Sequence, residues 1–516
     1  MKYKKCHGRP SAKPFGSTPE KVKAMAELHK AKEARRQSQQ GQGRPIISLE
    51  HQGYRFTAVG NELHYGKNHK TFFDFLDSYI HAVLEPKWGN AEIAKPLEER
   101  HKILQWYDAI CALQKANMKK PEGEIQDMPM NGLLAAYYGL AYNLYLLKHN
   151  AKLQEYLIRR LKQPEHFYAA YYETYVATWF ILAGFELRLE DERDSSRTHP
   201  EFIATRDGQS YSVEAKTRHP GKKHFDVGNQ LYAGLCIEAQ HPRVIFIDMN
   251  VGTDVDFEAF ANEALAAIRS REPKLTIQGV PAPPAYVYVT NQPYHLALNE
   301  TRLPLACLPV GFKIPDFGYR VQFSSYTEAY KARMKYSALN DVQKAMADYS
   351  IPVTFDGEIP QFAFGEVERR FTIGERIKVA DDVFMTLQGG TVVEQEKKAC
   401  LLVTDDDGRC HTMSTVLSDN EIAVYKSHPE TFFGRIVRIP KTIEDPMDLY
   451  AFFINSYKDT PRQKLLELIG VGPYIEEIKK LSDEELRYAY AEQLTRGLVR
   501  DKKKNRITTH PITEKL

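Results

Sequence analysis

The sequence predicts an α/β protein whose central sheet lies between residues 161 and 325. Apolar, strand-like runs recur there, and helical patterns separate the later ones, which is typical of parallel strands joined by crossover helices. The preceding segment, 72–184, carries apolar residues near helical spacing instead. We expect strands at 185–189, 201–205, 210–216, 244–249 and 285–290, and helices at 227–239 and 257–269.

Changes in composition divide the 516 residues into seven segments. The expected segments are an irregular start (1–18), a charged helix and linker (19–45), a mainly helical domain (46–160), the α/β core (161–325), a connecting helix (326–350), a small β-rich domain (351–445) and a helical basic tail (446–516). Alternation over Tyr54–Val59 before the Gly60-Asn61 turn predicts a hairpin within 46–65.

The overall composition indicates an ordinary soluble protein. The net charge is only +3, so a nucleic-acid site would have to come from local clustering of charge. The six cysteines are mostly far apart, which suits a reducing compartment. The most apolar run, Gly132–Leu147, is too short to span a membrane and reads as a buried helix. We therefore expect a cytoplasmic protein that does not enter membranes.

One predicted hairpin carries the functional argument. Asp207-Gly208 lies between two β-prone runs, and such a pair favours a two-residue turn with positive φ at both positions. In that register, the numbers of paired residues add to a constant, and Glu201 faces Glu214. Two carboxylates directly opposite each other repel and destabilise a sheet. A divalent cation between them would reverse this effect, because Mg²⁺ and Mn²⁺ prefer oxygen ligands.

Strand alternation adds a lysine to the carboxylate pair. Glu214 and Lys216 point to the same face of their strand. An ammonium there could orient a water molecule or offset charge that develops on a phosphate. Two further candidates are Glu173, a carboxylate in an otherwise apolar and aromatic helix, and Gln230, early in the helix after the hairpin. Phosphodiester hydrolysis needs such a constellation together with a metal.

The order of these elements resembles the core of the PD-(D/E)xK nucleases over residues 167–250. A helix with a glutamate, a strand, a strand that begins Pro-acid, a strand that ends acid-x-Lys, a helix and a strand follow one another. The resemblance implies a restriction-endonuclease-like fold, with Glu173, Glu201 and Glu214 as ligands of Mg²⁺ or Mn²⁺ and Lys216 and Gln230 beside them. The sequence departs from the family in having Pro200-Glu201 where Pro-Asp is usual. Glutamate has the same ligand chemistry but is one methylene longer.

The first eight residues resemble the second half of a SEC-C motif, a small zinc-binding module. Cys6 and His7 follow a Lys/Tyr-rich stretch, as in that motif. A structural zinc ion needs four ligands, so Zn²⁺ is expected only if upstream sequence supplies the missing Cys-x-Cys pair. Either the start codon has been assigned inside the motif, or the chain has lost the module.

The tail carries weaker signals of DNA binding. Gly470-Val471-Gly472 resembles the turn of a helix-hairpin-helix motif, in which backbone N–H groups hold a phosphate. Glu476-Glu477 departs from that motif, and an ordinary packed corner between helices explains the turn equally well. Lys502, Lys503 and Lys504 form a basic run that either contacts nucleic acid or is a solvated end.

The sequence thus predicts a metal-dependent nuclease that acts on nucleic acid, with DNA the expected form. The alternative is an adaptor that keeps the nuclease fold and binds nucleic acid or protein without catalysis. The two hypotheses differ in whether Glu201, Glu214 and Lys216 converge on one metal ion.

Overall fold

The computed structural model describes most of the chain, and the described residues form two compact units. They are residues 19–117, 119–121, 124–126, 128–151, 155–189, 199–218, 226–252, 256–303, 305–434, 445–470, 475–499 and 507–508. One unit comprises residues 1–39 and 356–440, and the other comprises residues 40–355 and 441–516. Residues 46–160 and 161–325, which the sequence suggests are two domains, lie in the same unit and share one hydrophobic core.

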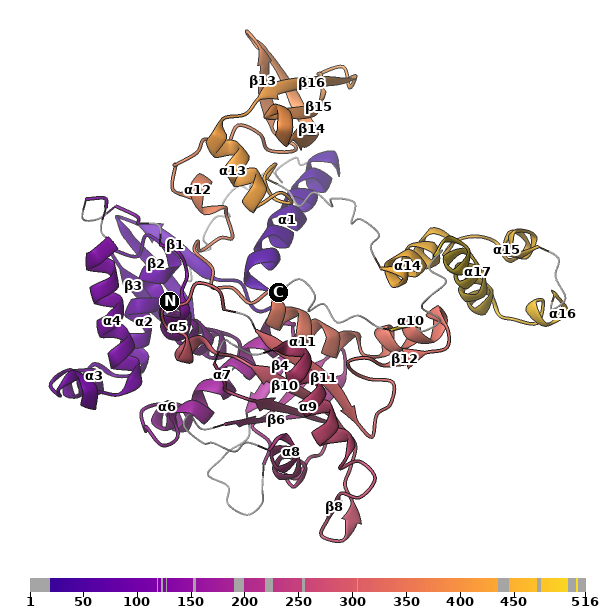
Figure 1. Ribbon diagram of the computed structural model, residues 1–516. Coiled ribbons are helices and arrows are strands. Elements are labelled where there is room, and N and C mark those ends of the chain that lie inside the picture. Colours follow the sequence, from indigo (N-terminus) through magenta and orange to yellow (C-terminus); the bar gives the residue numbers. More distant parts are fainter. Residues whose placement is uncertain are drawn as a thin grey trace, which may run out of the picture. The chain divides into compact units, whose positions relative to one another are not determined.

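The larger unit is built on a six-stranded mixed sheet (Figure 1). In spatial order, its strands are β11 (Ala306–Phe312), β10 (Ala285–Asn291), β7 (Arg243–Asp248), β6 (Gln209–Thr217), β5 (Phe202–Arg206) and β4 (Glu186–Leu189). β4, β5 and β6 form an antiparallel meander, β6, β7 and β10 run parallel, and β11 returns antiparallel. The two parallel connections pass through α8 (Val227–Leu235) and α9 (Phe257–Arg269), so the mixed α/β class is confirmed.

Helices pack on both faces of this sheet. α7 (Phe167–Leu182) packs on one face, where its Trp179 contacts Phe246 of β7. α8 and α9 pack on the other face with Ile245 and Ile247. Strands that are covered on both sides read as continuous apolar runs, which is why the sequence signal for β7 and β10 is strong.

The predicted hairpin is confirmed. Asp207 and Gly208 have φ of 50° and 77°, as the two-residue turn requires. Thr205 pairs with Ser210 and Ile203 with Ser212, in the expected register. The alternation is confirmed too, since Val213 and Ala215 join the core beneath α7 while Glu214 lies between them in sequence and points to the other face.

Three other elements differ from the expected ones. The helix expected at 227–239 ends at Leu235, which Cys236 follows as its C-cap. The helix expected over 326–349 is two helices, α10 (Tyr326–Lys335) and α11 (Ser337–Ala347). They break at Tyr336, whose hydroxyl donates a hydrogen bond to Asp316 (2.7 Å). The expected hairpin within 46–65 is present, with Gly60-Asn61 as its turn, and a further strand before it makes a three-stranded sheet.

The remainder of the larger unit before the central sheet is a layer of helices with that small sheet. The helices are α2 (Phe72–Val83), α3 (Pro86–Ile93), α4 (Lys102–Asn117), α5 (Gly132–Asn150) and α6 (Glu155–Leu161). The strands are β1 (Ile47–His51), β2 (Tyr54–Val59) and β3 (Glu62–Gly66), in that spatial order. α5 packs against α2, α4 and α7 and is buried almost all round, as its uniformly apolar sequence predicts.

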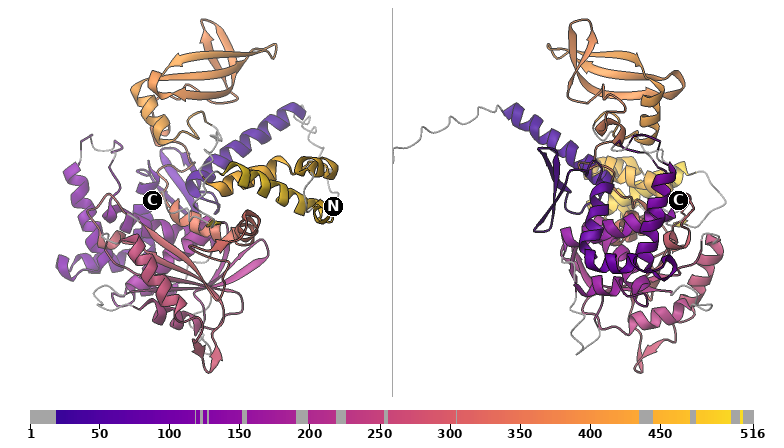
Figure 2. Two further views of the ribbon diagram at one scale, coloured as in Figure 1. Left: turned by 45° about the vertical axis from the view of Figure 1, so that its right-hand side comes forward. Right: turned by 90° about the vertical axis from the view of Figure 1, so that its left-hand side faces the viewer.

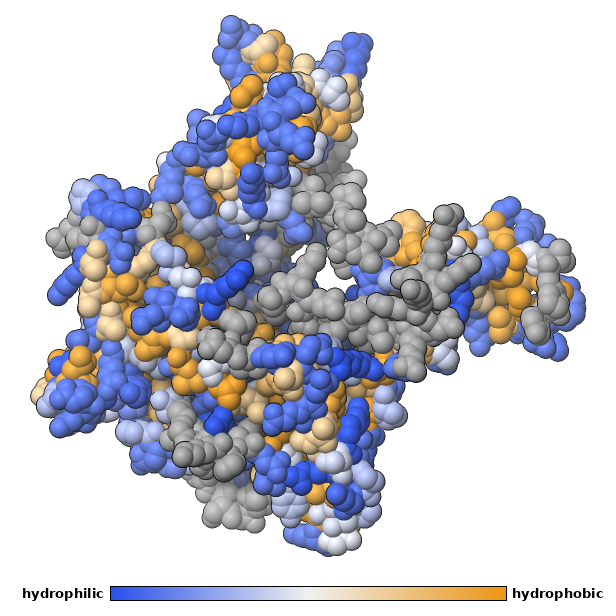
Figure 3. All heavy atoms as spheres, in the orientation of Figure 1, coloured by the Kyte–Doolittle hydropathy of each residue, from blue (hydrophilic) through white to orange (hydrophobic). Residues whose placement is uncertain are grey.

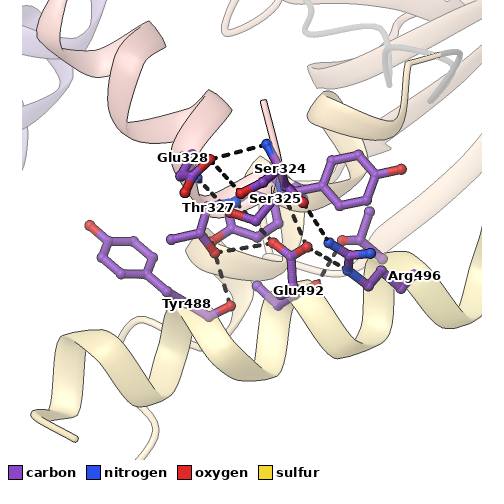
Figure 4. A network of polar contacts seen from close by, with 11 residues as sticks. Ser324, Ser325, Thr327, Glu328, Tyr488, Glu492 and Arg496 are labelled. Atoms are coloured by element: carbon purple, nitrogen blue, oxygen red, sulfur yellow. Dashed lines mark hydrogen bonds and ion pairs between the residues drawn. The ribbon is translucent and has the colours of Figure 1, made fainter. Parts of the chain in front are cut away.

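The tail forms a helical group that packs on α10. Its helices are α14 (Pro446–Ser456), α15 (Arg462–Ile469), α16 (Ile475–Ile478) and α17 (Asp483–Leu498). In Figure 4, Glu492 of α17 accepts hydrogen bonds from the backbone N–H groups of Tyr326 (3.2 Å) and Thr327 (2.9 Å). A carboxylate at the N-terminus of a helix is favourable because of the helix dipole. Arg496 donates to Glu492 (2.6 Å) and to the Ser324 carbonyl (3.2 Å), which completes the anchor.

The smaller unit contains a four-stranded antiparallel meander and three helices. These are α1 (Pro19–Gln40), α12 (Pro360–Ala363), β13 (Arg376–Ala380), β14 (Val383–Val393), β15 (Lys398–Thr404), β16 (Cys410–Val416) and α13 (Asp419–Ser427). One face of the sheet is buried in a core that includes Leu387, Leu401 and Phe433. The β-rich character expected for residues 351–445 is therefore present.

Hydrophilic side chains cover most of the face shown in Figure 3, with hydrophobic patches between them. Phe452 and Leu498 of the tail are large apolar side chains that are exposed. Within the described part of the chain, no helix is both long enough and apolar enough to cross a membrane.

Candidate active site

The predicted carboxylates meet at the C-terminal end of β6. Glu201 lies directly before β5, and its backbone N–H donates to the carbonyl of Val213 (3.0 Å), the residue that already pairs with Phe202. The register of β5 and β6 therefore ends at Phe202–Val213 and does not include the predicted Glu201–Glu214 pair, but Glu201 is close enough that its charge raises the pKa of Glu214. Ligands bind at this kind of edge in open α/β sheets, beyond the carboxyl ends of parallel strands.

Glu214 is the most strongly perturbed group of the site. Its side chain is only 6% exposed, and burial together with the nearby Glu201 carboxylate raises its pKa to about 8. Lys216 donates a hydrogen bond to Glu214 Oε1. Glu214 Oε2 is buried and has no hydrogen-bond partner among the described residues, and the nearby N–H of Glu201 is already bonded to Val213. An orphaned, buried carboxylate oxygen is costly unless a cation or a proton joins it.

Burial also raises the pKa of Glu201, against the opposing influence of Arg160 and Lys216. For Lys216, burial works against the charged form, but the carboxylates of Glu214, Glu201 and Glu173 outweigh it and raise the pKa. The ammonium therefore stays charged at neutral pH. The carboxyl groups of Glu201 and Glu214 lie close together away from water, so ionisation of both is unfavourable unless another cation binds beside them.

The helical glutamate joins the cluster through an arginine that the sequence did not suggest. Arg160 of α6 grips the buried Glu173 of α7 with two hydrogen bonds, Nη2–Oε1 at 2.5 Å and Nη1–Oε2 at 2.8 Å. Glu201 lies near this pair, because Arg160 and Glu173 both lower its pKa against the effect of burial. Arg160 and Glu173 are 13 residues apart on different helices, so no sequence spacing could have revealed their pairing.

The structure does not bring every predicted residue into the site. Gln230 is half-buried on α8, which packs against β6, but no described side-chain hydrogen bond connects it to the carboxylates. Within the described residues, no three His, Cys, Asp or Glu side chains are grouped in a way that could hold a metal ion. Two of the carboxylates are instead paired with cations, Glu173 with Arg160 and Glu214 with Lys216.

A second buried acid, Asp248, lies at the end of β7, on the face of the sheet that α7 covers, whereas Glu214 points to the other face. It pairs in register with Thr217 of β6 and Thr290 of β10. Burial raises the pKa of Asp248 to about 7, although it accepts hydrogen bonds from Thr290 Oγ1 (3.0 Å), Thr217 Oγ1 (3.3 Å) and the Gln292 N–H (3.1 Å). The sequence did carry a signal for it, an acid that ends an otherwise apolar strand next to Met249.

The remaining candidates lie mostly outside the described residues. Gly470 ends α15 with a φ of +80°, a conformation that favours glycine. The other candidates of the two termini are outside the described part, namely Cys6, His7, Gly472, Lys502, Lys503 and Lys504.

Comparisons with known proteins found no similar protein. No protein-family model, no curated protein and no solved structure matches this chain. Function is therefore inferred from the geometry of the cluster at the end of β6 and from the sequence.

Proposed function

We propose that the chain hydrolyses phosphodiester bonds of nucleic acid with a divalent metal ion, as a nuclease of the PD-(D/E)xK type. One observation carries the proposal: Glu201, directly before β5, lies close enough to the buried Glu214 of β6 for its charge to raise the pKa of Glu214, and Lys216 donates a hydrogen bond to Glu214. A fold that needed only stability would gain nothing from two neighbouring acids. The element order α7, β4, β5, β6, α8, β7 supports the same family, as does the meander that leads into parallel strands.

The residues present fit a divalent cation. Glu214 Oε2 is a buried oxygen without a partner among the described residues, and Glu201 lies directly before the neighbouring strand β5. Carboxylate oxygens are the ligands that Mg²⁺ and Mn²⁺ prefer. Glu201 and Glu214 would hold the ion, and Glu173 would join them if Arg160 released it. When bound, the ion would lower the pKa of a coordinated water and polarise the scissile phosphate.

The chain's own residues would prepare the site for this chemistry. Without a cation, Glu214 keeps a proton up to about pH 8, and this proton must leave before both of its oxygens can act as ligands. Lys216 places a fixed positive charge where a phosphate would approach, and can stabilise the negative charge of the transition state. Arg160 holds Glu173 in place, and its guanidinium is a second fixed cation near the carboxylates.

A second candidate function is supported by the same cations. Because Arg160 and Lys216 already neutralise Glu173 and Glu214, the cluster is also compatible with an adaptor that keeps the fold and binds nucleic acid without cleaving it. The two functions differ in what a divalent cation does. A nuclease needs the ion for cleavage, whereas an adaptor would bind its partner equally well in EDTA.

A cleavage assay tests the proposal directly. Purified full-length protein is incubated with supercoiled plasmid, single-stranded DNA and RNA, in EDTA, Mg²⁺ or Mn²⁺. We expect ion-dependent cleavage of at least one substrate, and its loss in both Glu214→Gln and Lys216→Met. Glu98→Gln, at an exposed position, is the matched control and should cleave normally. A folded protein that cleaves none of the three, or cleavage that persists in Glu214→Gln, would contradict the proposal.

A further inference from the structure

The β1–β2–β3 sheet presents an unusual outer face. Strand register places Leu49, Phe56 and Tyr65 side by side across the three strands. Ile47, Ala58 and Leu63 form the next row on the same face, and His51 and Tyr54 the row on the other side. Large apolar side chains on this face are far from buried, with Leu49 68%, Tyr65 65%, Leu63 62% and Ile47 56% exposed.

The opposite face of this sheet is already used by the core. Thr57 and Val59 are fully buried, and His64 packs edge-on against Phe75 and Tyr79 of α2. The apolar outer face is therefore distinct from the face that packs against the core. In the right-hand view of Figure 2, the sheet (dark indigo) lies at the outer side of the helical layer of its unit. An apolar face of this kind on a folded unit marks an interaction site.

Aromatic rings occupy the middle of the face. The ring of Phe56 lies 5.7 Å from that of Tyr65 and 6.4 Å from that of Tyr54, and Tyr54 and Tyr65 are 6.2 Å apart. Lys67 Nζ lies 5.1 Å above the Tyr54 ring. Three neighbouring rings with a cation at their margin are what a stacking platform for unpaired bases needs, since every base offers a π-face and the cation can meet a phosphate.

The charges around the face favour an anionic partner. By strand alternation, the acids Glu50 and Glu62 belong to the opposite face of the sheet, where Arg55 (2.8 Å) and Lys148 (2.8 Å) pair with them. Lys67 has no ion-pair partner among the described residues, so it leaves the margin of the face positive. A surface made only to pair with an identical apolar surface would not need this cation. Charge complementarity thus favours a polyanion as the binding partner of this face.

We propose that the outer face of the β1–β2–β3 sheet is a binding platform for single-stranded nucleic acid, on which unpaired bases stack against Tyr54, Phe56 and Tyr65 while Lys67 contacts the backbone. The choice of nucleic acid rests in part on the function proposed above. It makes single-stranded regions the preferred substrate class, because the platform cannot stack bases that are paired in a duplex.

Binding is measured in EDTA, so that the test does not depend on cleavage. Fluorescence anisotropy with labelled 15-nucleotide poly-dT and poly-U and with a 15-base-pair duplex compares the wild type with a Tyr54→Leu/Tyr65→Leu variant. Leucine keeps an apolar surface but removes the stacking rings. The matched control is Leu49→Gln/Leu63→Gln, which removes apolar surface and leaves the rings. Circular dichroism and thermal melts confirm that each variant is folded.

We expect the wild type to prefer the single strands over the duplex. The tyrosine variant should bind single strands about tenfold or more weakly, because stacking contributes strongly for each base, and the glutamine variant should bind within a few-fold of the wild type. Lys67→Gln should reduce the salt dependence by about 0.7 log unit for each phosphate that the variant no longer neutralises. Unchanged binding by the tyrosine variant would overturn the proposal.

The other possible occupant, a second copy of the chain, is an outcome of the same test. A wild type that is dimeric by light scattering, and becomes monomeric in the glutamine variant, would assign the face to self-association and overturn the platform. The proposed active site is tested separately by the cleavage assay, because binding in EDTA does not depend on cleavage. If the wild type binds single strands in EDTA but cleaves none with Mg²⁺ or Mn²⁺, the nuclease proposal fails while the platform stands.

Discussion

Replacing Glu214 by glutamine should change how stability depends on pH. Glu214 has a pKa of about 8 in the folded protein, above its ordinary value of 4.5, because it is buried beside the Glu201 carboxylate. Between these two values the folded chain holds a proton that the unfolded chain has released. The free energy of unfolding of the wild type therefore falls as pH rises through this window. In the variant, which has no carboxyl group at this position, this decrease is absent.

The size of the effect follows from the pKa difference. One pKa unit corresponds to about 1.4 kcal/mol, so the free energy of unfolding of the variant minus that of the wild type should rise by up to about 1.4 kcal/mol per pH unit. The whole window gives an upper limit of about 4–5 kcal/mol. The difference should be flat below about pH 4.5 and above about pH 8. The pH-independent part of this stability difference includes the loss of the ion pair with Lys216, which glutamine cannot form.

Tryptophan fluorescence in urea provides the assay, in EDTA at a series of pH values. All three tryptophans, Trp88, Trp106 and Trp179, belong to the larger unit, so the signal follows the unit that contains the site. Glu98→Gln serves as the exposed control and should follow the wild type at every pH. Parallel curves for Glu214→Gln and the wild type would refute the reasoning, since they would mean that the Glu214 carboxyl titrates normally.

Three other substitutions have effects that the structure and the sequence predict. For Asp248→Asn, the stability difference from the wild type should rise only up to about pH 7, where Asp248 titrates, and the same urea series distinguishes this from the Glu214 profile. Arg160→Met should lower the free energy of unfolding by about 3–5 kcal/mol, because it removes the cation that holds the buried Glu173, whereas Arg159→Met, at the exposed neighbouring position, should cost little. If the tail turn grips phosphate, a folded Gly472→Val protein should bind duplexes of any sequence more weakly in a filter-binding assay, and unchanged binding would assign the turn to packing.

The strand framework of the site could be predicted from the sequence because its rules are local. Asp207-Gly208 fixes the turn, the turn fixes the register, and strand alternation then places Glu214 and Lys216 on one face, whereas Glu201 lies one residue beyond the paired register. The helix expected at 257–269 is confirmed to the residue, and the structure shows Asp256 as its N-cap.

The tertiary contacts of the site could not be predicted in this way. Arg160 reaches Glu173 from another helix, and Tyr336, where α10 and α11 break, bonds to Asp316, 20 residues away. Alternation in β2 indicated a strand but not which of its faces would be buried, because both carry apolar residues. The exposed aromatic face with Tyr65 became visible only with the three-dimensional structure.

The most direct test of the central claim is calorimetric titration of the full-length protein with Mn²⁺ at pH 7, in two buffers with different ionisation heats. If Glu201 and Glu214 bind the ion, the buried carboxyl with a pKa of about 8 must lose its proton. We predict close to one proton released per ion at pH 7, a smaller release above pH 8, and loss of this binding in Glu214→Gln but not in Glu98→Gln. No binding heat in the folded wild type, or equal binding and proton release in Glu214→Gln, would contradict a metal site at the end of β6.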